Sequence, residues 1–228
     1  MMSLVGVGEA STTRPIVVLV GAAGAGKGTQ ASILAAELGY RHLATGDLFR
    51  AALRDRTALG EQARVYIDRG DLVPDELAIG LVAEALADQS AAGGVILDGF
   101  PRTAAQASAL DAILAAGGDQ IGRVVAIDVS EAELVARLSG RWSCPACGTP
   151  YHQVYDPPRQ PGICNNDGTA LTQRDDDRVE VVRARLTKQI PPMREVIAHY
   201  RSADLLSQVD GSRPIDEVTA AIRAEVGA

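Results

Sequence analysis

The chain has 228 residues, of which 46% are hydrophobic and 22% charged, and its net charge is −7. This composition is typical of a globular protein with one substantial core, and no run approaches the roughly 18 apolar residues that a membrane span needs. The acidic excess argues against a surface that binds nucleic acid through a broad basic field.

The N-terminal residues and the cysteines indicate in which cellular compartment the protein is located. Residues 1–14 lack the basic start and the unbroken apolar stretch of a signal peptide, so we expect them to form a disordered N-terminal extension. The three cysteines fall within one short segment, which is not the pattern of a secreted disulfide framework. We therefore expect a cytoplasmic location.

Stretches rich in β-branched residues alternate with stretches of helical spacing along most of the chain. Residues 15–20, PIVVLV, predict a strand buried on both faces, and an Ala- and Leu-rich helix follows over 30–38. A second strand ends at Asp98 before a helix over 104–114. A third ends near Asp128, before a helix that Ser130 caps.

The C-terminal part continues this alternation. Residues 204–209 predict a short strand, and Pro214 opens a final helix. Strands alternating with helices imply an α/β protein whose parallel sheet is covered on both faces.

Residues 141–177 interrupt the alternation. Helical periodicity disappears there, and Pro, Gly, Asn, Asp and Cys accumulate. A long irregular segment inside a compact domain is usually functional and often a lid. We expect a small separate module, inserted between two helices.

The stretch GAAGAGK at residues 21–27 matches the phosphate-loop pattern G-x-x-x-x-G-K and stands between a strand and a helix, as that pattern requires. Glycines let backbone N–H groups converge on phosphate oxygens, and the helix N-terminus adds partial positive charge. Lys27, one of two lysines beside 20 arginines, would reach the outer phosphates. Gly28 stands where Ser or Thr usually follows the lysine, with Thr29 one position later. The context predicts a nucleoside-triphosphate site rather than a glycine-rich turn.

Further motifs narrow the reaction. LATGDLFRAA (43–52), DLVPDE (71–76), LDGFPRTAAQ (97–106) and the arginines at 174 and 185 occur in the order expected of an adenylate kinase. From Pro15 to the last helix the chain resembles that family, and KGTQ and DGFPRT are the most specific signatures. The resemblance implies a P-loop nucleoside monophosphate kinase fold, a five-stranded parallel sheet flanked by helices. It implies a core of residues 15–43, 74–140 and 178–228, an AMP-binding helical insertion at 44–73 and a metal-clipped lid at 141–177.

The resemblance also implies the reaction, which is reversible phosphoryl transfer from MgATP to AMP, giving two ADP. The partners would be ATP, AMP and ADP, with no nucleic acid and no membrane, and the protein would be a monomer. The attacking phosphate oxygen is already ionised, so positioning and charge stabilisation should do most of the work without a general base. The catalytic residues that the resemblance implies are Lys27, Asp98, Arg102, Arg141, Arg174 and Arg185.

The resemblance also implies which residues form the two nucleotide sites. For ATP they comprise Gly24, Ala25, Gly26, Lys27, Gly28, Thr29, Arg137, Arg141, Pro150, Tyr151 and Arg213. For AMP they comprise Thr45, Arg50, Asp71, Leu72, Val73, Gly99, Phe100, Pro101, Arg102, Gln106, Arg174 and Arg185. Asp98, at a strand end, would hold Mg²⁺ through water, and Arg102 would grip the acceptor phosphate.

Each of these roles has a plainer alternative. Gln106 would read the adenine edge, although a flipped amide would suit guanine, and the residue could instead be a solvated helix position. Any single arginine could be a solvated surface residue, and Asp98 a capping residue. Arg137 and Arg141, four apart, are expected to share one helix face or its end.

The irregular segment carries a candidate metal site. Cys144-x-x-Cys147 and Cys164-x-x-Asp167, sixteen residues apart, have the spacing of a two-knuckle zinc site with one oxygen ligand. A lid of some thirty residues cannot hold its shape by burial alone, so the Zn²⁺ would be structural. The alternatives are a degenerate site without metal, a redox C-x-x-C pair, and His152 in place of Asp167.

Rival functions also remain at this point. Two alternatives differ little from an adenylate kinase: a kinase for another nucleoside monophosphate, and a kinase that uses GTP as the donor. From other classes come a zinc-ribbon nucleic-acid module fused to a P-loop ATPase and a P-loop protein that only binds. The charge of −7 and the lack of a basic, aromatic-rich face count against the nucleic-acid module.

Overall fold

The computed structural model describes residues 14–69, 71–88, 93–173 and 177–227. Within these residues, five strands form one sheet of order β2-β3-β1-β4-β7, and every neighbouring pair is parallel. The strands are β1 (Pro15–Val20), β2 (Arg41–Ala44), β3 (Val95–Asp98), β4 (Gln120–Asp128) and β7 (Leu206–Asp210). The predicted five-stranded parallel sheet is confirmed.

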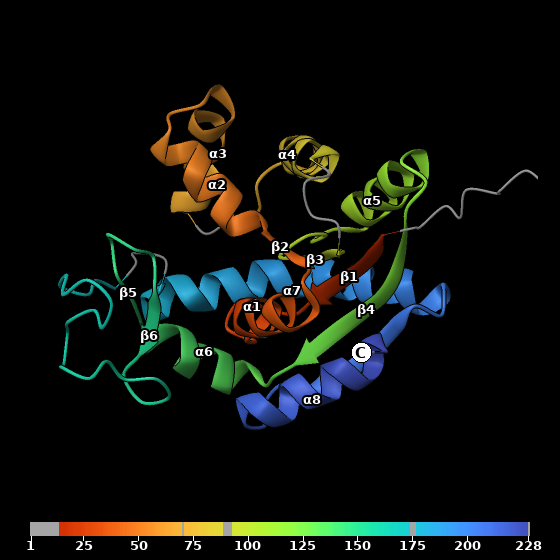
Figure 1. Ribbon diagram of the computed structural model, residues 1–228. Coiled ribbons are helices and arrows are strands. Elements are labelled where there is room, and N and C mark those ends of the chain that lie inside the picture. The colour runs from red at the N-terminus through yellow and green to blue at the C-terminus, as the bar shows by residue number, and fades with distance from the viewer. Residues whose placement is uncertain (1–13, 70, 89–92, 174–176, 228) are drawn as a thin grey trace, which may run out of the picture.

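Helices cover both faces of the sheet (Figure 1). They are α1 (Lys27–Leu38), α4 (Asp75–Ala87), α5 (Ala104–Ala116), α7 (Val179–Ser202) and α8 (Ile215–Val226). Alternate residues of β1 enter different cores, as the two-residue period of a strand requires. Ile16 and Val18 pack with α4 and α5, whereas Val17 packs with α1 and α8. The helix α7 contributes to both cores, which ties the two layers together.

The structure differs from the predicted strands at two places. The last strand begins at Leu206 rather than Asp204, because Asp204 has a φ of 57° and belongs to the turn after α7. The sequence patterns did not predict the edge strand β2. It has only four residues, and Arg41 and His42 make half of it polar, so it lacks the apolar run that marks the other strands.

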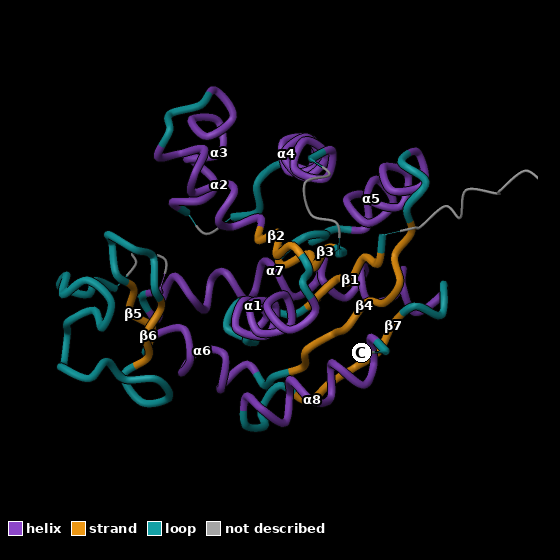
Figure 2. Tube along the Cα trace, viewed as in Figure 1, coloured by secondary structure: helices purple, strands orange, loops and turns teal. Residues whose placement is uncertain are grey.

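Two insertions project from the same side of the sheet. The helices α2 (Thr45–Arg54) and α3 (Ala58–Asp68) follow β2, and the pair β5 (Arg141–Ser143) and β6 (Pro150–His152) follows α6 (Glu131–Ser139). Both lie on the left in Figure 1, beyond the carboxyl ends of the strands. Loops and turns make up most of 141–173, as the composition predicted, apart from the short antiparallel pair (Figure 2).

Candidate active site

The loop between β1 and α1 wraps tightly around the start of the helix. Gly24 and Gly26 have φ values of 86° and 95°, in the left-handed region that a side chain disfavours. A Cβ on Gly24 would also stand 2.9 Å from Leu138 on α6. The predicted ATP residues Gly24–Thr29 therefore lie together in this loop and the first turn of α1, where backbone N–H groups and the helix terminus favour an anion.

Lys27 bends back over the same loop. Its Nζ donates hydrogen bonds to the carbonyl oxygens of Gly21 (2.9 Å) and Ala22 (3.0 Å). Burial lowers the pKa of Lys27 from 10.5 to about 8, the charge of Asp98 opposes this effect, and Arg102 and other arginines add to it. The ammonium therefore lies in an electropositive recess.

Asp98 closes this recess at the carboxyl end of β3. Its Oδ2 lies 3.4 Å from His42 Nε2, and a Cβ on Gly28 would stand 3.3 Å from the same oxygen. Burial alone would raise the pKa of Asp98, but the His42 imidazole and the Lys27 charge outweigh it, so the pKa lies below its ordinary value. Asp98 is thus an ionised carboxylate at the strand end, where open parallel sheets bind ligands.

A pocket lies between this recess and the helices α2 and α4. Its walls are partly apolar, from Phe49, Ile67 and Ala78, and partly cationic. Nearly all the residues predicted for AMP line it, namely Thr45, Arg50, Asp71, Leu72, Val73, Gly99, Phe100, Arg102, Gln106 and Arg185. Pro101 is buried and is not among the lining residues, and Arg174 lies outside the described residues.

Arg102 stands between the pocket and the phosphate loop. Its Nε donates to the carbonyl oxygen of Gly99 (2.6 Å), whose φ of 79° suits glycine. Desolvation and the nearby charge of Arg185 lower the pKa of Arg102. Two guanidinium groups and the Lys27 ammonium thus share one region, where Asp98 offsets part of their repulsion and a bound anion would offset more.

A second group of arginines gathers around a buried aspartate. Asp177 is fully buried and accepts two hydrogen bonds from Arg141, at 2.8 and 2.6 Å, while Arg185 Nη1 lies 3.9 Å away. Arg141 is not on the helix face of Arg137, because α6 ends at Ser139 and Arg141 begins β5. Of the two predicted alternatives, a shared helix face or the end of the helix, the structure gives the end of the helix.

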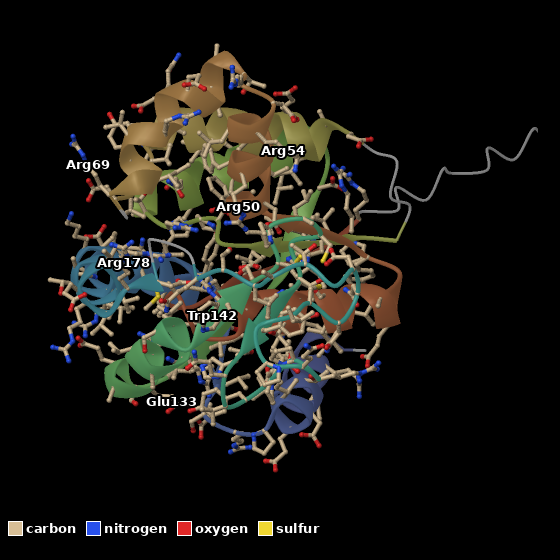
Figure 3. All side chains as sticks on the ribbon, turned by 90° about the vertical axis from the view of Figure 1, so that its left-hand side faces the viewer. Arg50, Arg54, Arg69, Glu133, Trp142 and Arg178 are labelled. Atoms are coloured by element: carbon tan, nitrogen blue, oxygen red, sulfur yellow. The ribbon has the colours of Figure 1, made fainter. Side chains whose placement is uncertain are left out.

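The remaining ATP-side residues are dispersed. Arg137 pairs with Glu133 at 2.9 Å on α6, and Arg213 is an exposed loop residue whose Nε lies 3.7 Å from Asp210. Pro150 and Tyr151 lie on β6, where the Tyr151 side chain points into the lid and its hydroxyl is 3.4 Å from Cys164 Sγ. Figure 3 looks onto this end of the molecule, with Arg50 on the α2 side and Trp142 in the lid.

Three cysteines and one aspartate meet inside the lid. Ligand atoms of Cys144, Cys147, Cys164 and Asp167 all lie within 4.8 Å of one another. Cys147 Sγ is 3.6 Å from Cys164 Sγ, and Cys144 Sγ is 3.3 Å from an Asp167 oxygen. These separations are close to the edge of about 3.8 Å of a tetrahedron with Zn–S bonds of about 2.3 Å. Hydrogen bonds from Thr169 hold the pKa of Asp167 far below its ordinary value, so its carboxylate is available as an anionic ligand.

Sequence reasoning missed two carboxylates that organise this site. Asp177 ends a run of three aspartates that looks like part of a polar loop, and Asp75 follows a proline at the start of α4. Asp75 accepts hydrogen bonds from Thr103 and Gln106. Only the position of Asp177 between Arg174 and Arg185 could have indicated an ion-pairing role.

A phosphate loop on a parallel sheet, beside an arginine-lined second pocket and under an inserted lid, defines a P-loop nucleoside monophosphate kinase. Comparison with known proteins specifies the family. An adenylate kinase family profile matches residues 19–205. Adenylate kinases from Exiguobacterium sibiricum (48% identical, covering 92% of this chain and 98% of that protein), Brevibacillus brevis (45%; 91% and 97%) and Staphylococcus epidermidis (45%; 89% and 94%) are similar.

The chain belongs to the adenylate kinase family. It is an enzyme, a phosphotransferase that moves a phosphoryl group reversibly between ATP and AMP, and the family uses Mg²⁺ with ATP. Within the described part of the chain, no helix has the length and apolar character to cross a lipid bilayer.

Proposed function

We propose that this adenylate kinase transfers the phosphoryl group in the space between the phosphate loop and the pocket under α2 and α4. The observation that carries the proposal is the convergence of Lys27 with Arg102 and Arg185 around the carboxyl end of β3. These cations come from distant parts of the chain, and the charge of Arg185 lowers the pKa of both Lys27 and Arg102. A pair of polyphosphates, facing each other end to end, would neutralise them.

In this proposal the donor nucleotide occupies the loop side. Backbone N–H groups of Gly24, Ala25, Gly26, Gly28 and Thr29 and the Lys27 ammonium hold its phosphates. Arg137 and Arg141, the backbone of Pro150 and Tyr151, and Arg213 contact the rest of ATP after the lid closes. Their present dispersal fits a site that becomes complete only on closure.

The acceptor occupies the pocket. Arg50 and Arg102 bind the AMP phosphate, as planar guanidinium groups bind phosphate well. Thr45, Asp71, Leu72, Val73, Gly99, Phe100 and Pro101 shape the rest of that site, and Gln106 contacts the adenine edge. Arg185 on α7 lines the same pocket and, with Arg174, is proposed to act beside the transferring group.

The chemistry then requires positioning and charge stabilisation. An acceptor phosphate oxygen attacks the terminal phosphorus of ATP in line, and the bond to the bridging oxygen breaks, leaving two ADP. Lys27, Arg102, Arg141 and Arg185 stabilise the charge that spreads over the transferring oxygens. Bound Mg²⁺ supplies further neutralisation of the ATP phosphates, and the ionised Asp98 at the strand end fits the role of holding it through water.

The proposed domain division follows from the need to keep water away from the transferring phosphoryl group. Water would compete with the acceptor, so two covers must close over the phosphates. We assign them to residues 44–73, which contain α2 and α3, and to the lid at 141–177. The core comprises 15–43, 74–140 and 178–228. Residues 1–14 precede it in sequence, and Arg14, the one residue of that stretch that the structure describes, pairs with Asp119. We further propose that the protein acts as a monomer in the cytoplasm.

The lid is proposed to bind one structural Zn²⁺ through Cys144, Cys147, Cys164 and Asp167. The closeness of their ligand atoms, all within 4.8 Å of one another, and the anionic Asp167 support this assignment. Among the described residues, the hydrophobic cluster here contains Tyr151 and Leu171 beside two of the cysteines, with Trp142 packed against it. A metal therefore has to supply the cross-linking that a small core cannot.

Metal analysis of protein purified without chelator should find about one zinc per chain, and EDTA should lower the melting temperature. Cys164→Ser should lose both the metal and the EDTA response. A protein free of metal, whose melting temperature does not change in EDTA, would exclude the zinc proposal.

The nucleotide proposal is tested by ADP formation from ATP with AMP, CMP, UMP or GMP as acceptor. AMP should be strongly preferred, and Arg102→Ala should lower kcat/KM at least about 1,000-fold with a nearly unchanged melting temperature, corresponding to about 4 kcal/mol of transition-state stabilisation. Near-normal turnover by Arg102→Ala would contradict the assignment.

A further inference from the structure

Gln106 is held by hydrogen bonds on both ends of its amide. The side chain is 2% exposed and lines the acceptor pocket at the start of α5. Its Oε1 accepts a hydrogen bond from the backbone N–H of Arg102 (2.8 Å), and its Nε2 donates to Asp75 Oδ1 (2.8 Å). It is therefore not the solvated helix residue that the sequence left open.

Asp75 is fixed in turn by Thr103. The Thr103 hydroxyl donates to Asp75 Oδ2 (3.0 Å) and accepts the backbone N–H of Gln106 (3.1 Å) as the N-cap of α5. Because the hydroxyl proton points to Asp75, both carboxylate oxygens act as acceptors. The first residue of α4 thus presents an acceptor to the Gln106 amide.

This arrangement permits one orientation of the amide. A flip would bring the Gln106 NH₂ against the Arg102 N–H and the Gln106 carbonyl against the Asp75 carboxylate, with donor facing donor and acceptor facing acceptor. In the permitted orientation, one N–H and one oxygen lone pair remain for a ligand. That pair complements a 6-aminopurine, which offers a ring acceptor and an amino donor, and opposes a 6-oxopurine, which offers the reverse.

We propose that Asp75 is a positioning residue for acceptor specificity, which locks the Gln106 amide so that the site accepts 6-aminopurine and rejects 6-oxopurine monophosphates. The inference rests on the proposed contact between Gln106 and adenine. Arg102 N–H belongs to the backbone and cannot be removed by substitution, so Asp75 is the part of the lock that a side-chain change can release. A site built to hydrogen-bond a substrate discriminates strongly, because a wrong partner leaves buried polar groups unpaired.

The test compares AMP with inosine monophosphate, which differs from AMP only at the purine 6-position and its ring nitrogen. Asp75→Asn keeps the shape of the side chain but can meet either amide orientation, because it carries one donor and one acceptor. In this variant only the Arg102 backbone N–H still disfavours the flip. Glu76→Gln is the matched control: Glu76 is the exposed neighbour in the same first turn of α4, and it loses the same charge there. The measured quantity is the ratio of kcat/KM for AMP to that for inosine monophosphate, which does not depend on the fraction of active protein.

Asp75→Asn should lower this ratio at least tenfold, mainly through a higher KM for AMP and a lower KM for inosine monophosphate, whereas Glu76→Gln should keep it within twofold. An unchanged ratio in Asp75→Asn, together with a ratio that falls in Gln106→Ala, would overturn the role of Asp75 and leave the adenine contact intact. An unchanged ratio in Gln106→Ala would overturn the contact itself, and with it this inference.

Discussion

Replacing Lys27 by methionine should stabilise the nucleotide-free protein in a pH-dependent way while abolishing turnover. The pKa of Lys27 is about 8 in the folded state and 10.5 ordinarily, so folding disfavours its proton. The penalty is fully present below pH 8 and is relieved as the pH rises towards 10.5. The full difference corresponds to about 3 kcal/mol, and about 2 kcal/mol of it should disappear between pH 7 and pH 10.

Urea unfolding of the wild type and Lys27→Met at both pH values measures this effect as a double difference, in which the titration of all other groups cancels. Lys188→Met is the control, since Lys188 is the only other lysine and its side chain is 52% exposed on α7. Relative to Lys27→Met, the wild type should gain about 2 kcal/mol in its free energy of unfolding from pH 7 to pH 10. If that difference is the same at both pH values, the recess does not destabilise the ammonium and the reasoning is refuted.

Three further changes test other parts of the structure. Asp177→Asn should lower the free energy of unfolding by about 2 kcal/mol in urea, because it weakens a buried partner of Arg141, and an equally stable variant would argue against that pairing. Gly60→Ala should lower the melting temperature markedly, because its Cβ would overlap the Ala52 carbonyl between α2 and α3; normal stability would contradict this packing. Asp167→Cys should retain about one zinc per chain and the thermal response to EDTA, since thiolate replaces carboxylate as an anionic ligand, and a metal-free variant would disagree with that view.

The cations that bind phosphate in the recess also lower the stability of the folded protein without ligand. Several cations held close together repel one another, and the folded protein carries that repulsion until anionic phosphates bind. Burial is the main cause of the lowered pKa of Lys27 and of Arg102, and the charges of neighbouring arginines lower both further. Binding energy from the nucleotides therefore also relieves strain in the folded protein, and ligand should raise its melting temperature.

Local features of the chain were sufficient to predict much of this protein. The apolar run of residues 15–20, the GAAGAGK loop and the Ser130 cap each act over a few residues, and their structures match the expectations. The cysteine spacing likewise brought the four predicted ligands together, because two turns with the same x-x spacing fold in the same way. Hydrophobic periodicity, glycine positions and ligand spacing are local properties of the sequence, so the sequence alone is sufficient to predict the structures that depend on them.

The tertiary structure alone decided which charged and polar groups meet. Asp177 and Arg141 are 36 positions apart in sequence, and Asp75 and Gln106 are 31 apart, so no local pattern pairs them. The edge strand β2 is a strand because β3 lies beside it, not because its four residues favour one. Hydrogen-bond partners across such separations depend on how helices pack on the sheet, and that packing fixed the orientation of the Gln106 amide.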